Sequence, residues 1–537
     1  MKKPKVVVVM PAHNAAMTLA ASYKRLPQQY IDEVILVDDA SNDKTLALAK
    51  KLGITTYRNN LNLGYGGNLK VCLTKALEKK ADIIIEYHPD NQYDPKNLPE
   101  FLEKVNHGFD FGLGSRFVHP KEALKRNMPV IKFIANRSLT FIEQFILGIE
   151  LTEFHSGFRL YTRKFLESVP YLQNSDDYLF SFEIIVQAVF YKFKIAEIQV
   201  ACDYHPQMHT ANLYRSTIYA IGTFKTLIQY VRSKFLSNPT GPFVKIQTFK
   251  CLLCKQQLTR REYQVEDAVS RKTFFVNFCA YCRIGSTWPQ PKNLGLFYPK
   301  TYYSKIKSFI YRLLQYRRPQ LIHTLIRKGK LLDIGCGDGT IAYQLGDQFD
   351  YVGIETPFAK ISNPRVKNVG IEGMHEKNNS YDLVTFWESF EHVANPIRAL
   401  HKSVAALKKE GYLIIECPNF ASWERLPFNS RWFHLDPPRH LFHYTPAGLK
   451  NLVEQNGFTV VRQALLYAPE YIPVGLAQSL LYRISPKLNV FAQNYQKKGS
   501  FTIPLLVIIF SIIFFPFSYI FYLLNGSPIQ LLIAQKK

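Results

Sequence analysis

Two stretches of this sequence, far apart in the chain, each carry a run of apolar residues into a turn of acidic or glycine residues. The first combines KVVVVMPAHNA at 5–15 with DEVILVDDASNDKT at 32–45, and the second is KLLDIGCGDGT at 330–340. In an open α/β sheet, ligands bind where the strands end at such turns. The sequence therefore predicts two nucleotide-binding sheets in one chain.

The same alternation of apolar and amphipathic segments surrounds each turn. Apolar runs lie at 6–10, 33–39, 81–87 and 109–116, and again at 330–335, 351–355, 381–388 and 411–419. This rhythm is typical of strand–helix units that build a mostly parallel sheet. A chain of 537 residues is long enough for several cores. We expect one domain at 1–236, a second at 300–537 and a small module at 245–295 between them.

Four of the eight cysteines fall into two pairs, Cys251-x-x-Cys254 and Cys279-x-x-Cys282. Pairs at this spacing form the tetrahedral Cys₄ site of a zinc ribbon, whereas four unrelated buried cysteines rarely fall into two such pairs. Because four thiolates leave no open coordination position, we expect the zinc to be structural. The predicted fold class is α/β, with two doubly wound sheets joined by a small zinc ribbon.

The chain is strongly basic, with a formal net charge of +25. Such a chain can bind nucleic acid, anionic lipid headgroups or phosphorylated substrates. No run of Lys and Arg exceeds three residues, and no RNA-binding signature is present. We therefore expect no nucleic-acid partner, and a basic zinc-containing nucleic-acid-binding protein is kept only as an alternative.

Polar residues follow two of the apolar runs in the N-terminal half. Asp38 and Asp39 can accept hydrogen bonds from the base and ribose of a nucleotide, or they can open a turn that caps the next helix. Asp90 and Gln92 can offer oxygen ligands to a hard cation that bridges a diphosphate, or they can belong to a polar turn. Neither pair alone decides between these interpretations.

The order of the motifs is more specific than any one of them: PAHNA, VDDASNDKT, NLGYGGN, HPDNQYDP, GSR and HSGFR. Over residues 4–230 this set resembles family 2 glycosyltransferases of the GT-A fold, in particular the branch of dolichyl- and polyprenyl-phosphate sugar transferases. The resemblance implies a nucleotide-sugar site at Pro11, Asp38, Asp39 and Asp90, a Mg²⁺ or Mn²⁺ site at Asp90 and Gln92, and contacts to phosphates from Arg116 and Arg159. It makes Asp90, Arg116 and Arg159 the catalytic residues of this half.

The chain departs from this family at two places. The usual metal motif is D-A-D-x-Q, and here its first two positions are His88 and Pro89. Many relatives carry Glu in P-x-x-N-E, where this chain has Ala15. We expect these changes to alter the metal affinity or the nucleotide preference of the site.

The acceptor decides whether the sugar transfer needs a base. A polyprenyl phosphate is already largely ionised at neutral pH, so positioning and stabilisation of the leaving diphosphate would suffice, with inversion of the anomeric centre. A sugar hydroxyl would need a general base. The candidates for that base are Glu153, Asp176, Asp177 and Glu183, each of which can equally be structural.

The glycine turn of the C-terminal half lets the backbone approach a ligand closely, and the helix that follows presents free N–H groups. Glu355 ends the next apolar run, where an acid can bind ribose hydroxyls. A dinucleotide site is the rival interpretation, but D-x-G-C-G-D-G at 333–339 differs from G-x-G-x-x-G.

Together with YDLVTFWESFEHVANP and LKKEGYLIIECPN, this turn resembles class I S-adenosylmethionine-dependent methyltransferases over residues 300–537, in particular the ubiquinone-biosynthesis-like branch. The zinc module resembles the N-terminal ribbon of bacterial relatives, several of which act on sugars. His392 and His440 are candidate bases, and each can equally be a structural histidine. The resemblance implies that S-adenosylmethionine binds at Asp333, Gly335, Gly337, Asp338 and Glu355.

Residues 501–524 form an uncharged apolar segment, long enough to cross a bilayer. The sequence after it, GSPIQLLIAQKK at 526–537, resembles the last, antiparallel strand of a methyltransferase sheet, which would return the chain to the same side. Because Pro504 and Pro516 are expected to interrupt a helix, we predict a half-inserted hairpin or an interfacial helix. A single span and a buried core helix are the alternatives.

Together these features predict a bifunctional enzyme of cell-envelope glycan synthesis at the cytoplasmic face of a membrane. One half would transfer a sugar from a nucleotide donor to a lipid phosphate or glycan. The other half would transfer a methyl group, and we expect its substrate to be a sugar. The alternative is a methyltransferase whose N-terminal domain is a degenerate sugar-nucleotide-binding module.

Overall fold

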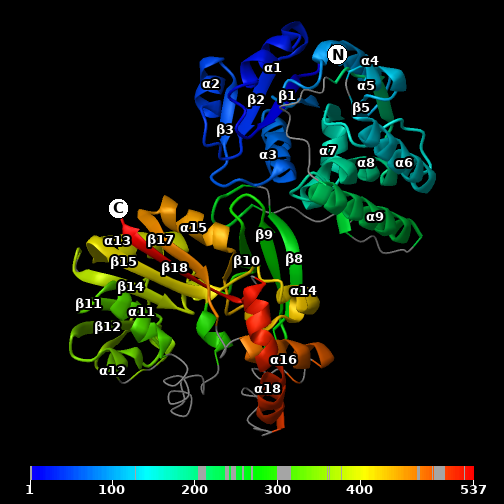
Figure 1. The fold of residues 1–537 in the computed structure, drawn as a ribbon. Coiled ribbons are helices and arrows are strands. Elements are labelled where there is room, and N and C mark those ends of the chain that lie inside the picture. The colour runs from blue at the N-terminus through cyan, green and yellow to red at the C-terminus, as the bar shows by residue number, and fades with distance from the viewer. Residues whose placement is uncertain are drawn as a thin grey trace. The chain divides into compact units, whose positions relative to one another are not determined.

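A computed structural model describes most of the chain, which divides into two compact units (Figure 1). Unit 1 comprises Met1–Lys250 and Gln256–Arg260, and unit 2 comprises Cys251–Lys255 and Arg261–Lys537. The described residues are 3–126, 128–202, 213–235, 241–243, 250–256, 259–267, 270–298, 316–359, 361, 363–375, 378–467, 472–485, 488, 502–524 and 526–537.

Unit 1 is built on a seven-stranded sheet in the order β3-β2-β1-β4-β6-β5-β7. Its strands are β1 (Val6–Ala12), β2 (Glu33–Asp38), β3 (Thr55–Arg58), β4 (Ile83–Glu86), β5 (Phe111–Ser115), β6 (Arg159–Thr162) and β7 (Ile195–Gln199). Only β6 runs antiparallel to its neighbours in this sheet. The apolar residues of β1 are buried, because a central parallel strand is covered on both faces. The predicted GT-A fold is confirmed.

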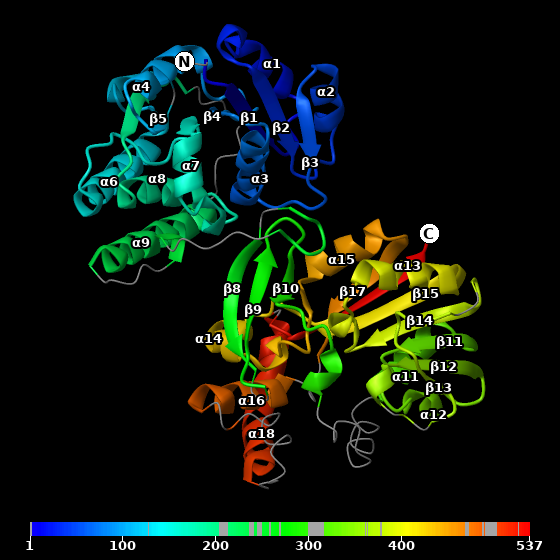
Figure 2. The same ribbon diagram turned by 180° about the vertical axis from the view of Figure 1, so that it is seen from behind.

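Helices connect these strands: α1 (Leu19–Arg25), α2 (Thr45–Lys51), α3 (Tyr65–Glu78), α4 (Leu98–Asn106), α5 (Pro120–Lys125), α6 (Val130–Leu147), α7 (Arg163–Ser168), α8 (Phe180–Phe190) and α9 (Leu213–Phe235). Within unit 1, helices α6, α8 and α9 gather at one side, near β5 (Figures 1 and 2). Helix α9 packs against both α6 and α8.

Unit 2 contains a second seven-stranded sheet, in the order β13-β12-β11-β14-β15-β18-β17. Its strands are β11 (Gly329–Ile334), β12 (Phe349–Glu355), β13 (Val366–Asn368), β14 (Tyr381–Trp387), β15 (Leu407–Pro418), β17 (Phe458–Leu465) and β18 (Ile529–Lys536). Strand β18 lies between β15 and β17 and is antiparallel to both. The last, antiparallel strand expected from the sequence is therefore present.

The helices of unit 2 include α11 (Arg317–Leu325), α12 (Ile341–Leu345), α13 (Pro396–Ala406), α14 (Arg425–Phe428), α15 (Pro446–Gln455) and α16 (Ile472–Ile484). A smaller sheet in this unit has the order β16-β10-β9-β8. It consists of β8 (Thr259–Glu266), β9 (Thr273–Cys279), β10 (Ile284–Trp288) and β16 (Phe442–Tyr444). The cysteine module therefore shares a sheet with a strand from much later in the chain.

The apolar segment near the C-terminus forms one helix, α18 (Thr502–Leu523), which contains Pro516. The expectation that prolines interrupt this segment, and with it the hairpin, is wrong. Residue 504 lies in the first turn, where a missing N–H costs nothing, and the helix continues through residue 516. Helix α18 packs against α16 through Val507. Within the described ranges, no helix is both long and apolar enough to cross a membrane.

Candidate functional site

The acidic turn of unit 1 lies where β1 and β2 end, and the strand register places Pro11 and Asp38 there together. The next residue, Asp39, is buried, and its carboxylate accepts hydrogen bonds from the backbone N–H groups of Leu63 at 2.8 Å and Gly64 at 3.1 Å. Burial raises the pKa of Asp39 by more than these bonds lower it. Asp39, which also accepts a hydrogen bond from the side chain of Asn59 at 2.8 Å, thus fixes the neighbouring turn.

Two of the candidate bases hold a loop against the start of α3. A Cβ atom at Gly66 would lie 2.3 Å from the carbonyl oxygen of Ser175, so only glycine fits at this contact. Lys70 of α3 donates to the carboxylate of Asp176 at 2.8 Å, and Glu183 of α8 accepts a hydrogen bond from the backbone N–H of Ser175 at 2.5 Å. Both carboxylates are therefore engaged in holding this loop.

Asp90 and Gln92 lie in the loop after β4. The Oδ1 atom of Asp90 accepts a hydrogen bond from the backbone N–H of Gln92 at 3.0 Å, and Thr18 and Arg25 of the neighbouring segment bind the same loop through Pro89 and Asn91. Of the described residues, no further His, Cys, Asp or Glu forms a metal-binding cluster with Asp90. A cation here would therefore complete its shell with diphosphate oxygens and water, as Mg²⁺ commonly does.

A buried charged network, which the sequence reasoning missed, lies behind this loop. Glu86 of β4 pairs in register with Arg159 of β6, and both side chains are fully buried. The carboxylate of Glu86 accepts hydrogen bonds from Tyr65 at 2.8 Å and from Tyr161, and it lies 3.0 Å from Nε2 of His88. His88, the departure from the family motif, is thus the partner of a buried carboxylate.

This network stays charged. Burial acts to raise the pKa of Glu86, but the hydrogen bond from His88 and the charge of Arg159 bring it below its usual value. Burial likewise acts to lower the pKa of His88, but its bond to Glu86 raises it. Arg159 interacts with Glu86 and Tyr161, but among the described residues its guanidinium N–H groups make no hydrogen bond of good geometry. A buried guanidinium with unsatisfied N–H groups fits a phosphate.

Arg116, in contrast, is neutralised by the protein. Its backbone N–H and Nε donate to one oxygen of Glu153 at 2.8 and 3.1 Å, and Nη2 donates to the other oxygen. Both side chains are buried. Because an arginine partner favours the ionised carboxylate, Glu153 is a weak base in this arrangement.

The glycine turn of unit 2 is tied to the end of β12. The backbone N–H of Gly337 donates to one oxygen of Glu355 at 2.8 Å, and that of Thr356 donates to the other at 2.8 Å. Gly335 and Gly337 have φ values of 74° and 60°, which favour glycine. A Cβ atom at Gly337 would meet nothing within 4 Å, so this backbone borders open space.

Asp333 supports the turn from inside the sheet. It is 1% exposed and accepts hydrogen bonds from Tyr351 and Thr385, both at 2.8 Å. Burial nevertheless raises the pKa of Asp333 to about 6. Asp338 accepts a hydrogen bond from the backbone N–H of Thr340 at 3.1 Å, at the start of α12. The five predicted donor-binding residues are thus gathered around one turn.

The two candidate bases of unit 2 lie next to each other. The ring centroids of His392 and His440 are 4.8 Å apart, and the Nε2 atoms of these rings lie 3.8 and 3.9 Å from Oε1 of the buried Glu391. Nδ1 of His392 lies 2.8 Å from the carbonyl oxygen of Arg439, and Nδ1 of His440 lies 3.0 Å from that of His434. A carbonyl only accepts, so each Nδ1 carries the proton and each Nε2 has a free lone pair.

Burial decides the charge of this cluster. It lowers the pKa of His392 to about 4 and holds that of His440 well below its usual value. Burial also raises the pKa of Glu391 to about 8. At neutral pH the cluster therefore holds two neutral imidazoles and a protonated acid, which can accept and pass on a proton. The three ligand atoms lie within 4.8 Å of one another, a spacing that also suits a metal ion.

Comparison with known proteins identifies both domains. Residues 7–169 match the model of glycosyl transferase family 2, and residues 303–463 match that of a methyltransferase domain. An uncharacterized protein of Methanocaldococcus jannaschii is 33% identical over 203 residues, which cover 38% of this chain and 83% of that protein. The chain belongs to glycosyl transferase family 2 and carries a methyltransferase domain.

Two further relatives of the glycosyl transferase unit have named activities. A UDP-N-acetylglucosamine–dolichyl-phosphate N-acetylglucosaminyltransferase of Methanococcus voltae is 27% identical over 217 residues, covering 37% of this chain and 86% of that enzyme. A polyprenol monophosphomannose synthase of Mycolicibacterium smegmatis is 25% identical over 207 residues, covering 36% of this chain and 76% of that enzyme.

The methyltransferase unit also holds the four paired cysteines, which are all free thiols. The Sγ atoms of Cys251 and Cys282 are 3.7 Å apart, and those of Cys254 and Cys279 are 3.6 Å apart. A tetrahedral Zn²⁺ site with bonds of about 2.3 Å places its sulfur atoms about 3.8 Å apart. The four thiols are therefore arranged as such a site requires.

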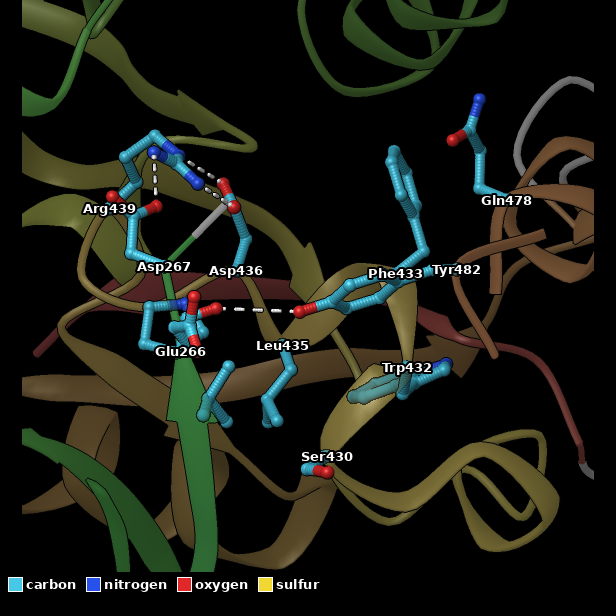
Figure 3. A pocket seen from close by; sticks show the side chains of 12 residues that line it. Glu266, Asp267, Ser430, Trp432, Phe433, Leu435, Asp436, Arg439, Gln478 and Tyr482 are labelled. Atoms are coloured by element: carbon cyan, nitrogen blue, oxygen red, sulfur yellow. Dashed lines mark hydrogen bonds and ion pairs between the residues drawn. The ribbon is translucent and has the colours of Figure 1, made fainter. Parts of the chain in front are cut away.

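A pocket of the methyltransferase unit opens between the end of β8, the segment 430–439 and α16 (Figure 3). Arg439 lines it and is held by hydrogen bonds to Asp436 and, at 3.2 Å, to Asp267. The carbonyl of the same arginine contacts His392. The pocket therefore adjoins the histidine cluster, and its lining contains none of the residues predicted to bind S-adenosylmethionine.

Beside this pocket, a buried acid lies under α16. A Cβ atom at Gly475 would lie 2.7 Å from Nε2 of His434 and 3.1 Å from Oε1 of Glu424, so both side chains pack directly beneath that glycine. Glu424 is fully buried, and burial raises its pKa to about 8. Burial lowers the pKa of His434 to about 3.

The substitution Glu424→Gln should remove part of the pH dependence of stability. The folded chain keeps Glu424 protonated up to about pH 8, whereas a free glutamate loses its proton near 4.5. Stability therefore falls as the pH rises through that window, by about 1.4 kcal/mol per unit, and Gln cannot show this loss. Denaturant unfolding between pH 5 and 8 measures it by tryptophan fluorescence, since all four tryptophans lie in unit 2. Exposed Glu372→Gln is the control, and equal slopes would contradict the prediction.

Proposed function

We propose that the glycosyl transferase unit transfers a sugar from a nucleotide sugar to a polyprenyl phosphate, with inversion at the anomeric carbon. Arg159 carries this proposal, because its guanidinium is a buried positive charge that lies in register with Glu86, at the end of the strand that leads into the loop of Asp90. Of the two relatives with named activities, one is named for dolichyl phosphate and the other for polyprenol monophosphomannose. Both names support a lipid phosphate as acceptor.

The arrangement suits an acceptor that needs no base. Glu153, Asp176 and Glu183 are all engaged in bonds to Arg116, Lys70 and a backbone N–H group. A phosphate oxygen that is already ionised attacks without losing a proton. Asp90 and Gln92 would hold a Mg²⁺ or Mn²⁺ ion, which supplies positive charge to the diphosphate. Arg159 would oppose the charge that develops on the phosphates during transfer.

For the methyltransferase unit, we propose transfer of a methyl group from S-adenosylmethionine to a hydroxyl of a sugar. Gly335, Gly337 and Glu355 would hold the donor, with Asp333 and Asp338 shaping the turn. The substrate oxygen would form a bond to the methyl carbon as the bond from carbon to sulfur breaks. Nε2 of His392 would take the hydroxyl proton, because its lone pair is free at neutral pH.

We further propose that Zn²⁺ at the four cysteines is structural, and that the chain works at the cytoplasmic face of a membrane. Helix α18 supports the second point. Ile512 is 67% exposed and Phe515 is 53% exposed, so its outward side suits the boundary between headgroups and acyl chains. We propose that α18 is the interfacial helix that the sequence predicts.

The decisive experiment supplies a panel of nucleotide sugars to the purified full chain with Mn²⁺, Mg²⁺ or EDTA, with and without polyprenyl phosphate. Turnover of one donor that requires the cation and is accelerated by the lipid is the expected result. Binding of S-adenosylmethionine is measured in parallel by calorimetry. Absence of turnover with every donor, while S-adenosylmethionine still binds, would instead identify the N-terminal unit as a sugar-nucleotide-binding module. The presence of His88 where the family motif has Asp favours this alternative.

A further inference from the structure

Helix α9 of unit 1 has its polarity partly reversed relative to an ordinary surface helix. Its outward row contains Ile221, Phe224 and Ile228, which are 64%, 44% and 59% exposed. Its inward side buries Thr223 and Thr226 together with Leu227 and Tyr230. A helix at a water-exposed surface normally places the apolar row inside and the polar row outside. Helix α9 is therefore built for an apolar surrounding on its outer side.

Helix α6 shows the same reversal. Ile134, Phe141 and Phe145 point outward, with exposed fractions of 58%, 70% and 84%. Thr140 and Glu143 are buried on its inner side. Since α6 and α9 pack against each other, the two outward rows occur on neighbouring helices (Figure 2). These rows, Ile134, Phe141 and Phe145 of α6 with Ile221, Phe224 and Ile228 of α9, are called the docking face below.

The inner sides of the two helices meet a polar side chain from the segment before β6. His155 lies with Nε2 3.2 Å from Glu143 of α6 and with Nδ1 2.8 Å from the hydroxyl of Tyr219 of α9. His155 belongs to the HSGFR motif, which ends at Arg159. The helices that carry the docking face thus contact the motif that holds the proposed phosphate-binding arginine.

We propose that the docking face of unit 1 lies on the surface of a bilayer that contains anionic lipids. Charge favours this occupant: α9 exposes Lys225, Arg232 and Lys234 and contains no acidic residue, and the acid of α6 is buried. Exposed apolar side chains would enter the boundary of the acyl chains while basic side chains meet the headgroups. This membrane contact rests on the proposed function in one respect, namely that the sugar acceptor is a lipid phosphate.

The same charges disfavour a second copy of the chain on this face. A symmetric dimer presents the same patch from both partners, so α9 would bring its basic residues near those of the other copy. No acid on α9 is available to offset them. An anionic lipid surface meets both the apolar and the basic requirement.

A tryptophan placed on the docking face tests the proposal in the full chain. Unit 1 has no native tryptophan, so Phe224→Trp adds a signal that is read as a difference from the unchanged chain. With vesicles of phosphatidylcholine and phosphatidylglycerol at 7:3, brominated acyl chains should quench this signal. Tyr30→Trp, at an exposed position in another part of unit 1, is the control and should not be quenched. Quenching should weaken in pure phosphatidylcholine and at high salt.

An affinity measurement complements the probe. The triple variant Ile221→Gln, Phe224→Gln, Ile228→Gln should bind these vesicles about tenfold more weakly. The matched variant Leu296→Gln, Val461→Gln, at exposed apolar positions of unit 2, should bind as the unchanged chain does. Equal thermal unfolding of the variants shows that folding is intact.

Three results would overturn the proposal. The first is a Phe224→Trp chain that sediments with vesicles while its added tryptophan is not quenched, and the second is a triple variant that binds vesicles as tightly as the unchanged chain. The third is a dimer, detected by light scattering, that the triple substitution dissociates. A face that shows neither lipid contact nor dimerisation would belong to an acidic protein partner, which also overturns it. Donor turnover is a separate readout. If no donor is turned over but the tryptophan is quenched, the proposed glycosyl transfer fails and the docking face stands.

Discussion

The substitution Asp90→Asn is expected to reduce turnover of the nucleotide sugar by about a thousandfold or more. Asn keeps the oxygen that accepts the hydrogen bond from Gln92, but it removes the negative charge that would hold a divalent cation. Without that cation, the charge that develops on the leaving diphosphate is opposed mainly by Arg159. Initial rates at increasing Mn²⁺ concentration measure the effect.

Asp94→Asn is the matched control, because Asp94 belongs to the same loop but caps the start of η2 (Pro95–Asn97) through the backbone N–H of Lys96. It should lose little activity. Both variants should unfold at the temperature of the unchanged chain. Full activity of Asp90→Asn with an unaltered Mn²⁺ dependence would remove Asp90 from the metal site.

The substitution Cys282→Ser is expected to unfold unit 2 and to abolish binding of S-adenosylmethionine. Cys251, Cys279 and Cys282 belong to the same buried core as Phe442 and Leu449, so loss of the metal would reach the large sheet. Structural zinc contributes about 10–16 kcal/mol in isolated zinc modules, which is comparable with the whole stability of a domain. Elemental analysis and tryptophan fluorescence measure zinc content and the state of unit 2.

Cys417→Ser provides the comparison, because Cys417 is fully buried in the same core but lies outside the cluster of four. That variant should keep one zinc per chain and a cooperative unfolding transition. Turnover of the nucleotide sugar reports on unit 1 in both cases. A Cys282→Ser chain that keeps its tryptophan emission and binds S-adenosylmethionine would show that the cluster does not stabilise this unit.

Local patterns were enough to predict the central strands of both sheets. Strands β1, β2, β11 and β12 are runs of apolar residues that end at distinctive turns, and such runs identify buried parallel strands. Strand β16 could not be predicted. It has three residues, and it exists because β10, from much earlier in the chain, offers an edge to pair with.

The sites could be predicted as lists of residues but not as networks. Arg116 and Arg159 looked alike in sequence, yet each lies beside a different buried carboxylate, Glu153 for the first and Glu86 for the second, and no local signal predicts either pair. His392 and His440 were both candidates, but their contact through Glu391 depends on how the segment 429–445 folds back. Periodicity likewise marks α6 and α9 as amphipathic without showing that their apolar rows face outward.

The position of β18 in the middle of its sheet affects how the chain is made. Until residues 529–536 leave the ribosome, β15 and β17 lack the strand that separates them. Their unpaired edges can then pair with other chains, while unit 1 is already complete and can fold. A chain that ended after α18 would consist of a folded glycosyl transferase unit joined to an aggregation-prone methyltransferase unit. Mutations in β18 are therefore expected to be as harmful to the methyltransferase domain as mutations in its other central strands.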